Sequence, residues 1–261
     1  MRLYATSDLH VDFEENRRFV EQLSPAEFTE DALIVAGDVA HRLDLIGETL
    51  GLLKRKFEEV FFVPGNHELW VGKNGEDSVK KFFRILELCD QLGVRTGPAE
   101  MEGCRIVPLF SWYDDSFDGR VDDPSLQNWV DFRHCRWPST VEAPALFFAG
   151  LNGDRIRASS EPTVSFSHFL PRPELLPDRH FLRFKGLPQV AGSASIERMV
   201  RQLGARVHVF GHSHIRRDVV LEGVRYVQHH LGYPRERRDR SFELKQIDWN
   251  LSADTEPLQS E

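Results

Sequence analysis

The segment ALIVAGD at residues 32–38 decides the fold. Its five apolar residues, 32–36, predict a buried β-strand. Gly37 and Asp38 follow directly, so the strand ends in a turn that carries a carboxylate. The same design, a strand followed at once by polar residues, occurs four more times. These segments are RLYATSDLH at residues 2–10, VFFVPGNHE at 60–68, TVSFSH at 163–168 and VHVFGHSH at 207–214.

The stretches around these segments show helical or strand periodicity. Helices are predicted at residues 15–23, 45–57, 77–92 and 195–203. Strands are predicted at residues 2–6, 32–36, 60–63, 105–109, 163–166, 207–210, 218–221 and 224–228, with 242–249 as a candidate last strand. Glu222-Gly223 indicates a hairpin turn. Strands that alternate with helices predict an α/β fold in which helices cover a sheet.

Residues 112–153 break this pattern, because they are rich in Asp, Pro, Trp and Phe without clean periodicity. Long irregular segments in compact domains are often functional loops or lids. Its side chains Trp112, Tyr113, Trp129 and Trp137 form either a substrate wall or a second small core. Tyr113 is therefore a candidate substrate-binding residue.

The five strand ends carry eight polar groups that can bind metal. They are Asp8, His10, Asp38, Asn66, His67, His168, His212 and His214. Ligands of open α/β sheets gather where strands end, so we expect these groups to converge. Carboxylate, imidazole and amide oxygen suit Mn, Fe or Zn. Eight groups are too many for one catalytic zinc, whereas two metal ions that share a carboxylate use them naturally.

The order DxH, GD, GNHE, H and GHxH resembles the calcineurin-like metallophosphoesterase superfamily, from about Leu3 to His214. The resemblance implies an α/β fold, a four-layer αββα sandwich of two mixed β-sheets flanked by helices. It implies a single metallophosphoesterase domain at 1–250, with an irregular insertion around 112–153 and a polar C-terminal tail at 251–261. It also assigns the site residues. Asp8, His10, Asp38 and His214 would hold one metal, Asp38, Asn66, His168 and His212 the other, and His67 would be the general acid.

The resemblance also implies a function, a metal-dependent phosphoesterase that hydrolyses a phosphodiester or phosphomonoester by attack of a metal-bridging hydroxide. The runs LIVAGDVAHR, VFFVPGNHELW and GYPRERR are similar to a bacterial subgroup that includes a 4′-phosphopantetheinyl hydrolase, which acts on carrier proteins. The substrate is therefore expected to be a small molecule or carrier-protein-bound. The alternatives are a protein or nucleotide phosphatase and, from another class, a non-catalytic interaction scaffold. The complete ligand set disfavours the scaffold.

The composition of the chain indicates which classes of partner and which cellular location to expect. The chain has 261 residues, with 33 basic against 41 acidic side chains and a net charge of −8, so nucleic acid is an unlikely partner. No apolar run approaches the ~20 residues that span a bilayer, and the N-terminus lacks a secretory pattern, so we expect no membrane partner. Three scattered cysteines without a CxxC pair favour a reducing, cytoplasmic location. The sequence gives no indication of oligomeric state.

Four further features remain open. Glu68 is interpreted as structural, holding its loop by backbone hydrogen bonds. His208, in an apolar strand, is interpreted as a core residue. His41 and Arg42 either contact a phosphate or lie solvated at a helix start, so Arg42 is a candidate substrate-binding residue. A basic run forms either a solvated strip or a docking patch for a carrier protein, since carrier proteins are acidic. The run comprises Arg235, Arg237, Arg238 and Arg240.

Overall fold

The computed structural model describes residues 1–72, 75–117, 124–237 and 242–250 of the chain. Its first sheet has the strand order β10-β1-β2-β3. The strands are β1 (Leu3–Thr6), β2 (Ala32–Val35), β3 (Glu59–Phe62) and β10 (Lys245–Ile247). The first three run parallel, while β10 pairs antiparallel with β1. Their carboxyl ends therefore lie along one edge of the sheet.

The second sheet has the strand order β4-β5-β6-β7-β9-β8. The strands are β4 (Ala99–Met101), β5 (Cys104–Pro108), β6 (Thr163–Phe166), β7 (Ala205–Phe210), β8 (Arg217–Leu221) and β9 (Val224–Gln228). The four inner strands are parallel, and β4 and β8 are antiparallel edges. Glu222 and Gly223, both with positive φ, turn the chain between β8 and β9, as predicted.

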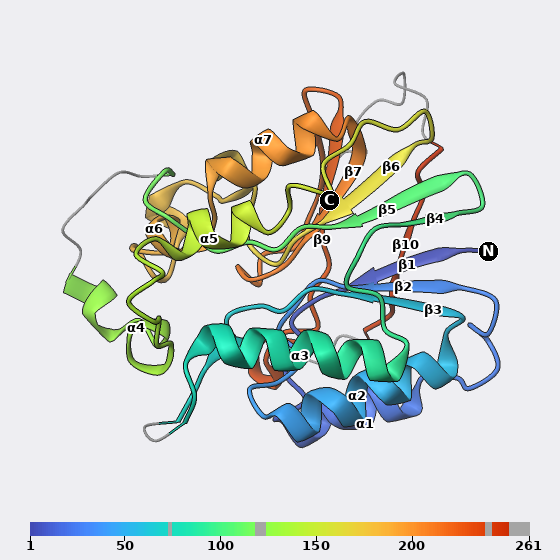
Figure 1. Ribbon diagram of the computed structural model, residues 1–261, viewed down its shortest axis with the longest axis horizontal. Coiled ribbons are helices and arrows are strands. Elements are labelled where there is room, and N and C mark those ends of the chain that lie inside the picture. Colours follow the sequence, from blue (N-terminus) through green and yellow to red (C-terminus); the bar gives the residue numbers. More distant parts are fainter. Residues whose placement is uncertain (73–74, 118–123, 238–241, 251–261) are drawn as a thin grey trace.

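Helices lie outside both sheets, which makes four layers. The helices are α1 (Glu14–Gln22), α2 (Leu43–Lys56), α3 (Ser78–Leu92), α4 (Asp131–His134), α5 (Pro144–Gly150), α6 (Pro188–Ala191) and α7 (Ala194–Gln202). Short 3₁₀ turns lie at η1 (His67–Leu69), η2 (Pro124–Asn128), η3 (Pro173–Leu175), η4 (Arg179–Phe181) and η5 (Pro234–Glu236). Figure 1 shows α1, α2 and α3 below the first sheet, and α5 and α7 above the second.

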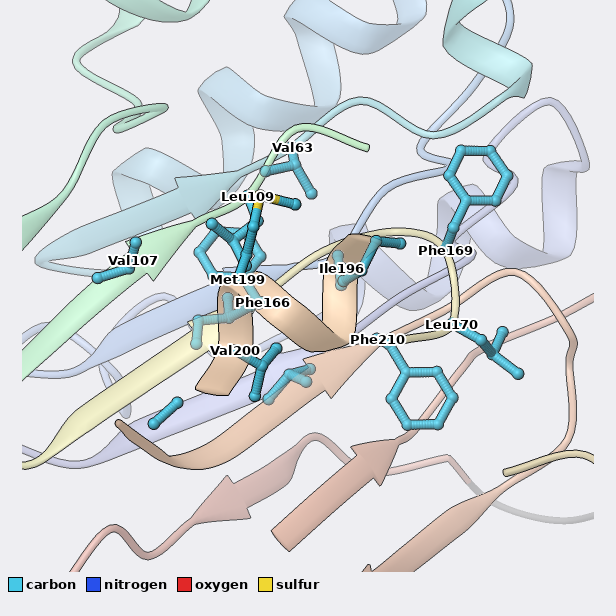
Figure 2. Close-up of a cluster of buried hydrophobic side chains, with 14 of the residues drawn as sticks. Val63, Val107, Leu109, Phe166, Phe169, Leu170, Ile196, Met199, Val200 and Phe210 are labelled. Carbon is cyan, nitrogen blue, oxygen red and sulfur yellow. The ribbon is translucent and has the colours of Figure 1, made fainter. Parts of the chain in front are cut away.

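The alternation of side chains along the strands explains the layers. In β2, Leu33 and Val35 belong to the cluster formed with α1, α2 and α3, while Ala32 and Ile34 belong to the cluster that includes the second sheet. Strands that are apolar on both faces can be covered on both sides. On the second sheet, Ile196, Met199 and Val200 of α7 join the larger cluster (Figure 2).

The predicted fold class is confirmed, and every predicted helix and strand exists with ends shifted by a few residues. The candidate strand at 242–249 shrinks to β10. Segment 112–153 is less irregular than expected, since η2, α4 and α5 lie within its described part. Within the described residues, no helix is long and apolar enough to cross a membrane.

Candidate metal centre

The predicted ligands meet where the carboxyl ends of the two sheets come together. The parallel strands β1, β2 and β3 place their clusters at one edge of the first sheet, and β6 and β7 do the same in the second. An isolated parallel β-bridge joins the two sheets at these strand ends. It pairs Ser7, just after β1, with His230, just after β9. Two separate sets of acidic and histidine side chains there have donor atoms within 4.8 Å of one another, and a third set, His10, Asp38 and His67, overlaps both.

The first set is Asp8, His10 and His214. The Nε2 atoms of His10 and His214 are 3.1 Å apart, and Asp8 Oδ1 is 3.3 Å from His214 Nε2. Asp8 and His10 come from the first sheet and His214 from the second. Asp8 and His10 are fully buried, and the His214 side chain is only 13% exposed.

The second set is Asp38, His168 and His212, and it is completed by Asn66. Asn66 Oδ1 lies 3.1 Å from His168 Nε2 and 3.0 Å from His212 Nδ1. Asp38 Oδ2 lies 3.5 Å from His168 Nε2. The same Oδ2 atom is 4.0 Å from His10 Nε2, so Asp38 stands between the two sets, where a bridging ligand would stand.

Outer hydrogen bonds fix which histidine nitrogen faces inward. His168 donates from Nδ1 to the carbonyl of Ala36, and His212 from Nε2 to that of Val190, both at 2.9 Å. The inward nitrogens therefore carry lone pairs, and both face the amide oxygen of Asn66. Three acceptors that face one another repel, unless a cation lies between them. This donor set fits a metal ion.

Charge leads to the same conclusion. Asp8, Asp38, Glu68 and Asp131 are all buried, and no described lysine or arginine forms an ion pair with them. Burial, followed by repulsion from Glu68 and Asp8, raises the pKa of Asp38 well above its usual range. Burial alone would lower the pKa of His214, but Asp8 and Glu236 raise it to about 9. The centre therefore attracts positive charge.

The turns that carry the ligands need special backbone geometry. Five of the predicted ligands have a positive φ, which side-chain-bearing residues adopt rarely. They are Asp8, His10, Asp38, His212 and His214. Glycines allow the close approach between turns. A Cβ at Gly37 would lie 2.4 Å from the His168 ring, and one at Gly65 would lie 2.3 Å from Asp38 Oδ1.

Glu68 holds two of these turns together, as predicted. Its carboxylate accepts hydrogen bonds from the backbone N–H groups of Asp38, Val39, Ala40 and Gly65. His208 is likewise the predicted core residue. It is fully buried between the hydroxyls of Ser165 and Ser167, at 2.8 and 3.0 Å.

Asp131 of α4 is a site residue that the sequence analysis missed. Its Oδ1 accepts from Asn66 Nδ2 at 2.9 Å and from Trp70 Nε1 at 2.6 Å, and its Oδ2 accepts from Trp129 Nε1 at 2.8 Å. Asp131 thereby fixes the amide of Asn66 so that its oxygen faces the histidines. Only its position after Trp129 could have drawn attention to it.

Glu236 is a second missed residue. Its Oε2 accepts from His214 Nδ1 at 2.8 Å and from the backbone N–H of Tyr233 at 2.9 Å. The carboxylate therefore orients the ring of His214 and ties η5 to the centre. The Tyr233 ring stacks on His10, with centroids 4.5 Å apart.

Two cavities open beside the centre. The larger, about 920 Å³, is lined by Asp38, Asn66, His212 and His214, and the smaller, about 520 Å³, by His10, Phe13 and Trp70. His67, Tyr233 and Arg235 line both. His67 Nε2 lies 3.8 Å from Asp38 Oδ2, and its ring packs 3.7 Å from that of Trp70. His67 is therefore the predicted residue best placed to reach bound substrate.

The two candidate substrate contacts lie elsewhere. Arg42 is exposed, pairs with Asp44, and lines neither cavity. Tyr113 is buried and also lines neither cavity. Of the tryptophans, Trp112 and Trp137 pack together in the core, whereas Trp129 lines the larger cavity. Segment 112–153 thus contributes both to the core and to a substrate wall.

Comparisons with known proteins show which family the chain resembles. A family model described as calcineurin-like phosphoesterase matches residues 1–216. The acyl-carrier-protein phosphodiesterase PptH of Mycobacterium tuberculosis is 32% identical over 269 residues, covering 91% of this chain and 80% of the relative. The crystal structure of the phosphopantetheinyl hydrolase PptH from the same organism matches with a TM-score of 0.76 and 29% identity. That match covers 94% of this chain and 95% of that one.

Proposed function

The chain belongs to the calcineurin-like phosphoesterase family, and on that basis we propose that it cleaves the phosphodiester joining a phosphopantetheine-type arm to a carrier protein. The family is metal-dependent, and the chain is a phosphoester hydrolase. The observation that carries the narrower proposal is the 32% identity to a carrier-protein phosphodiesterase over 91% of the chain. A cavity of about 920 Å³ at the metal centre is large enough for the arm.

The proposed centre holds two divalent or trivalent ions, chosen from Mn, Fe and Zn. Asp8, His10, Asp38 and His214 would hold one, and Asp38, Asn66, His168 and His212 would hold the other. When bound, these ions would neutralise phosphoryl oxygens and lower the pKa of water towards neutrality. This assignment is supported by the inward lone pairs around Asn66 and by the position of Asp38 between the two sets.

His67 is the proposed proton donor to the departing oxygen. Its backbone N–H donates to Asp38 Oδ1 at 3.0 Å, which fixes the start of η1, and Trp70 supports its ring. Burial and the neighbouring imidazoles of His10, His168 and His214 hold the pKa of His67 well below its usual range. An anionic phosphate ester beside the ring opposes that lowering and so favours the protonated form that a proton donor needs. No serine or cysteine nucleophile is needed.

The test is hydrolysis of a phosphopantetheinylated carrier protein by the metal-loaded enzyme. We expect the carrier to lose the mass of the phosphopantetheine group and to retain its serine hydroxyl, measured by mass spectrometry. In water labelled with oxygen-18, the label should enter the released phosphate ester and not the serine. Coenzyme A, cyclic nucleotides, nucleotides and phosphopeptides serve as competing substrates.

Two outcomes would overturn the proposal. Faster turnover of phosphopeptides or nucleotides would assign a phosphatase. No turnover of bis-p-nitrophenyl phosphate or its monoester with Mn, Fe or Zn would favour the interaction scaffold.

A further inference from the structure

A short basic strip, residues 179–185 (RHFLRFK), lies at the mouth of the larger cavity. Four of its residues, 181–184, line that cavity. The strip contains three cationic side chains and no acidic one, in a chain whose net charge is −8. The strip is therefore positively charged, whereas the chain as a whole is negatively charged.

Contacts with the rest of the protein hold the strip in one conformation. Leu182 is buried, and Phe184 stacks parallel on Trp129 with centroids 5.3 Å apart. Lys185 Nζ donates to the carbonyls of Arg179 and His180, at 3.0 and 2.6 Å. These contacts fix the backbone of the strip against the wall of the site.

Two side chains of the strip project away from this scaffold. Phe181 is 70% exposed, which leaves a large apolar ring in water beside the cavity. Arg183 is exposed, and it forms no ion pair with any residue that the structure describes. Aromatic and arginine side chains are both enriched at protein-binding surfaces.

We propose that the basic strip docks the acidic carrier protein, with Phe181 as the apolar contact and Arg183 as the charge contact. The proposal rests on the proposed function. Charge complementarity favours a carrier over other partners, because the cations of the strip attract an acidic protein although the rest of the chain has an acidic surface. A long nucleic acid would have to cross that surface. Docked there, a carrier delivers its arm directly into the larger cavity.

The basic run that the sequence first indicated is described only at Arg235 and Arg237. The guanidinium of Arg237 points inward, donating to Asn16 Oδ1 at 2.6 Å and to the Gly232 carbonyl at 3.2 Å. Arg235 lines both cavities at the metal centre. Arg238 and Arg240 lie outside the described residues. Within the described residues, the exposed apolar and charged contacts of the proposed docking surface therefore come from residues 179–185, and Arg235 lines the same cavity.

The experiment compares Arg183→Glu and Phe181→Ser with the matched control Arg206→Glu in full-length, metal-loaded enzyme. Arg206 is exposed at the start of β7, at the opposite end of the strand from the site. Affinity for the apo-carrier, which lacks the arm, is measured by titration at low and high salt. Turnover of the phosphopantetheinylated carrier and of bis-p-nitrophenyl phosphate is measured in parallel, and circular dichroism confirms folding.

We expect Arg183→Glu to weaken apo-carrier binding about tenfold and to raise KM for the loaded carrier by a similar factor. The effect on the small diester should be several times smaller, and Arg206→Glu should behave as wild type. Added salt should weaken wild-type binding more than binding by the variant. Phe181→Ser should weaken binding at all salt concentrations.

Three results would overturn the docking proposal. They are equal effects on carrier and small diester, apo-carrier binding that is unchanged in Arg183→Glu, and competition by a single-stranded oligonucleotide as strong as that by the carrier. If the loaded carrier is bound but never cleaved, the proposed function is wrong while the docking proposal stands. Binding to the apo-carrier does not depend on cleavage, so the two failures are distinguishable.

Discussion

At the scale of single residues, the centre depends on backbone conformations that most side chains avoid. Asp8, His10 and His212 have φ values of 52°, 43° and 73°. Such conformations cost about 1–3 kcal/mol each and persist only where surrounding contacts determine them. The N–H of Asp8 donates to Gly37 O at 2.9 Å, and that of His212 to Asp8 Oδ1 at 3.0 Å. The turns therefore hold one another in place.

Gly65→Ala should disrupt this arrangement. The added Cβ would lie 2.3 Å from Asp38 Oδ1 and 2.8 Å from His168, so the bridging carboxylate and a histidine must move. We expect loss of bound metal and of activity, measured by elemental analysis and diester hydrolysis. Gly97→Ala is the control, since nothing lies within 4 Å of its Cβ. Full metal content in Gly65→Ala would contradict the proposed closeness of these ligands.

Asp131→Asn should weaken one half of the centre. The two oxygens of Asp131 accept from Asn66 Nδ2 and from the indole N–H groups of Trp70 and Trp129. An amide has one oxygen, so either orientation places NH₂ against a donor. We expect a roughly 10–100-fold loss of metal affinity, measured by titration with Mn²⁺. The exposed Asp90→Asn should match wild type, and equal affinities in all three proteins would refute the role.

His67→Ala should separate proton donation from metal binding. We expect kcat to fall by roughly 10²–10⁴-fold for a serine ester and much less for a p-nitrophenyl ester, whose leaving group needs no proton. Metal content should stay normal, whereas Asp38→Asn should lose both metals. If His67→Ala loses metal, His67 is a ligand instead. Full occupancy in Asp38→Asn would exclude the bridging role.

At the scale of elements, the sequence predicts what local patterns determine. The run ALIVAGD contains a predicted strand, a predicted turn and a predicted ligand within seven residues. The structure places β2 at Ala32–Val35, with Asp38 in the turn after it. Asp131 and Glu236 could not be predicted in this way. Their roles arise from contacts with Asn66 and His214, 65 and 22 residues away in the chain. Tertiary packing alone brings these pairs together.

The structure of segment 112–153 could not be predicted from local sequence patterns either. It includes α4 and α5, of four and seven residues, which are too short to show helical periodicity. Its order comes from a buried anchor after α5, Asn152. Asn152 Oδ1 accepts from the N–H of Phe110 at 2.9 Å, and its Nδ2 donates to the Phe110 carbonyl at 2.8 Å. One side chain thus substitutes for a strand partner at the end of β5.

Asn152→Ala should therefore destabilise the fold. The N–H and C=O of Phe110 would be left buried without these partners, at a cost of about 2 kcal/mol in the free energy of unfolding. Urea denaturation followed by circular dichroism measures this loss. The exposed Asn128→Ala, in η2 of the same segment, should change stability by less than about 0.5 kcal/mol. Equal stability of both variants would show that the segment is held by its apolar contacts alone.

At the scale of the whole molecule, the centre joins the two sheets. The first set combines Asp8 and His10 of one sheet with His214 of the other, and the second combines Asp38 with His168 and His212. Metal ions bound there would link the sheets at their carboxyl edges. They would also offset the formal charge of −8, moving it to about −4 with two divalent ions. The local charge at the mouth then favours phosphate esters on an acidic protein.

Removal of the metals should therefore abolish activity and also destabilise the contact between the two sheets at their carboxyl edges. A ligand present at about 100 times its Kd stabilises a fold by about 2.7 kcal/mol, so chelation should lower Tm by about 5–10 °C. Calorimetry measures this shift, and adding Mn²⁺ back should restore it. Hydrogen exchange should rise first in residues 212–214 and 231–236, whose turns contact the ligands, while β2 and α2 stay protected. If chelation removes all metal while Tm and the exchange of these turns stay unchanged, the ions are catalytic without linking the sheets.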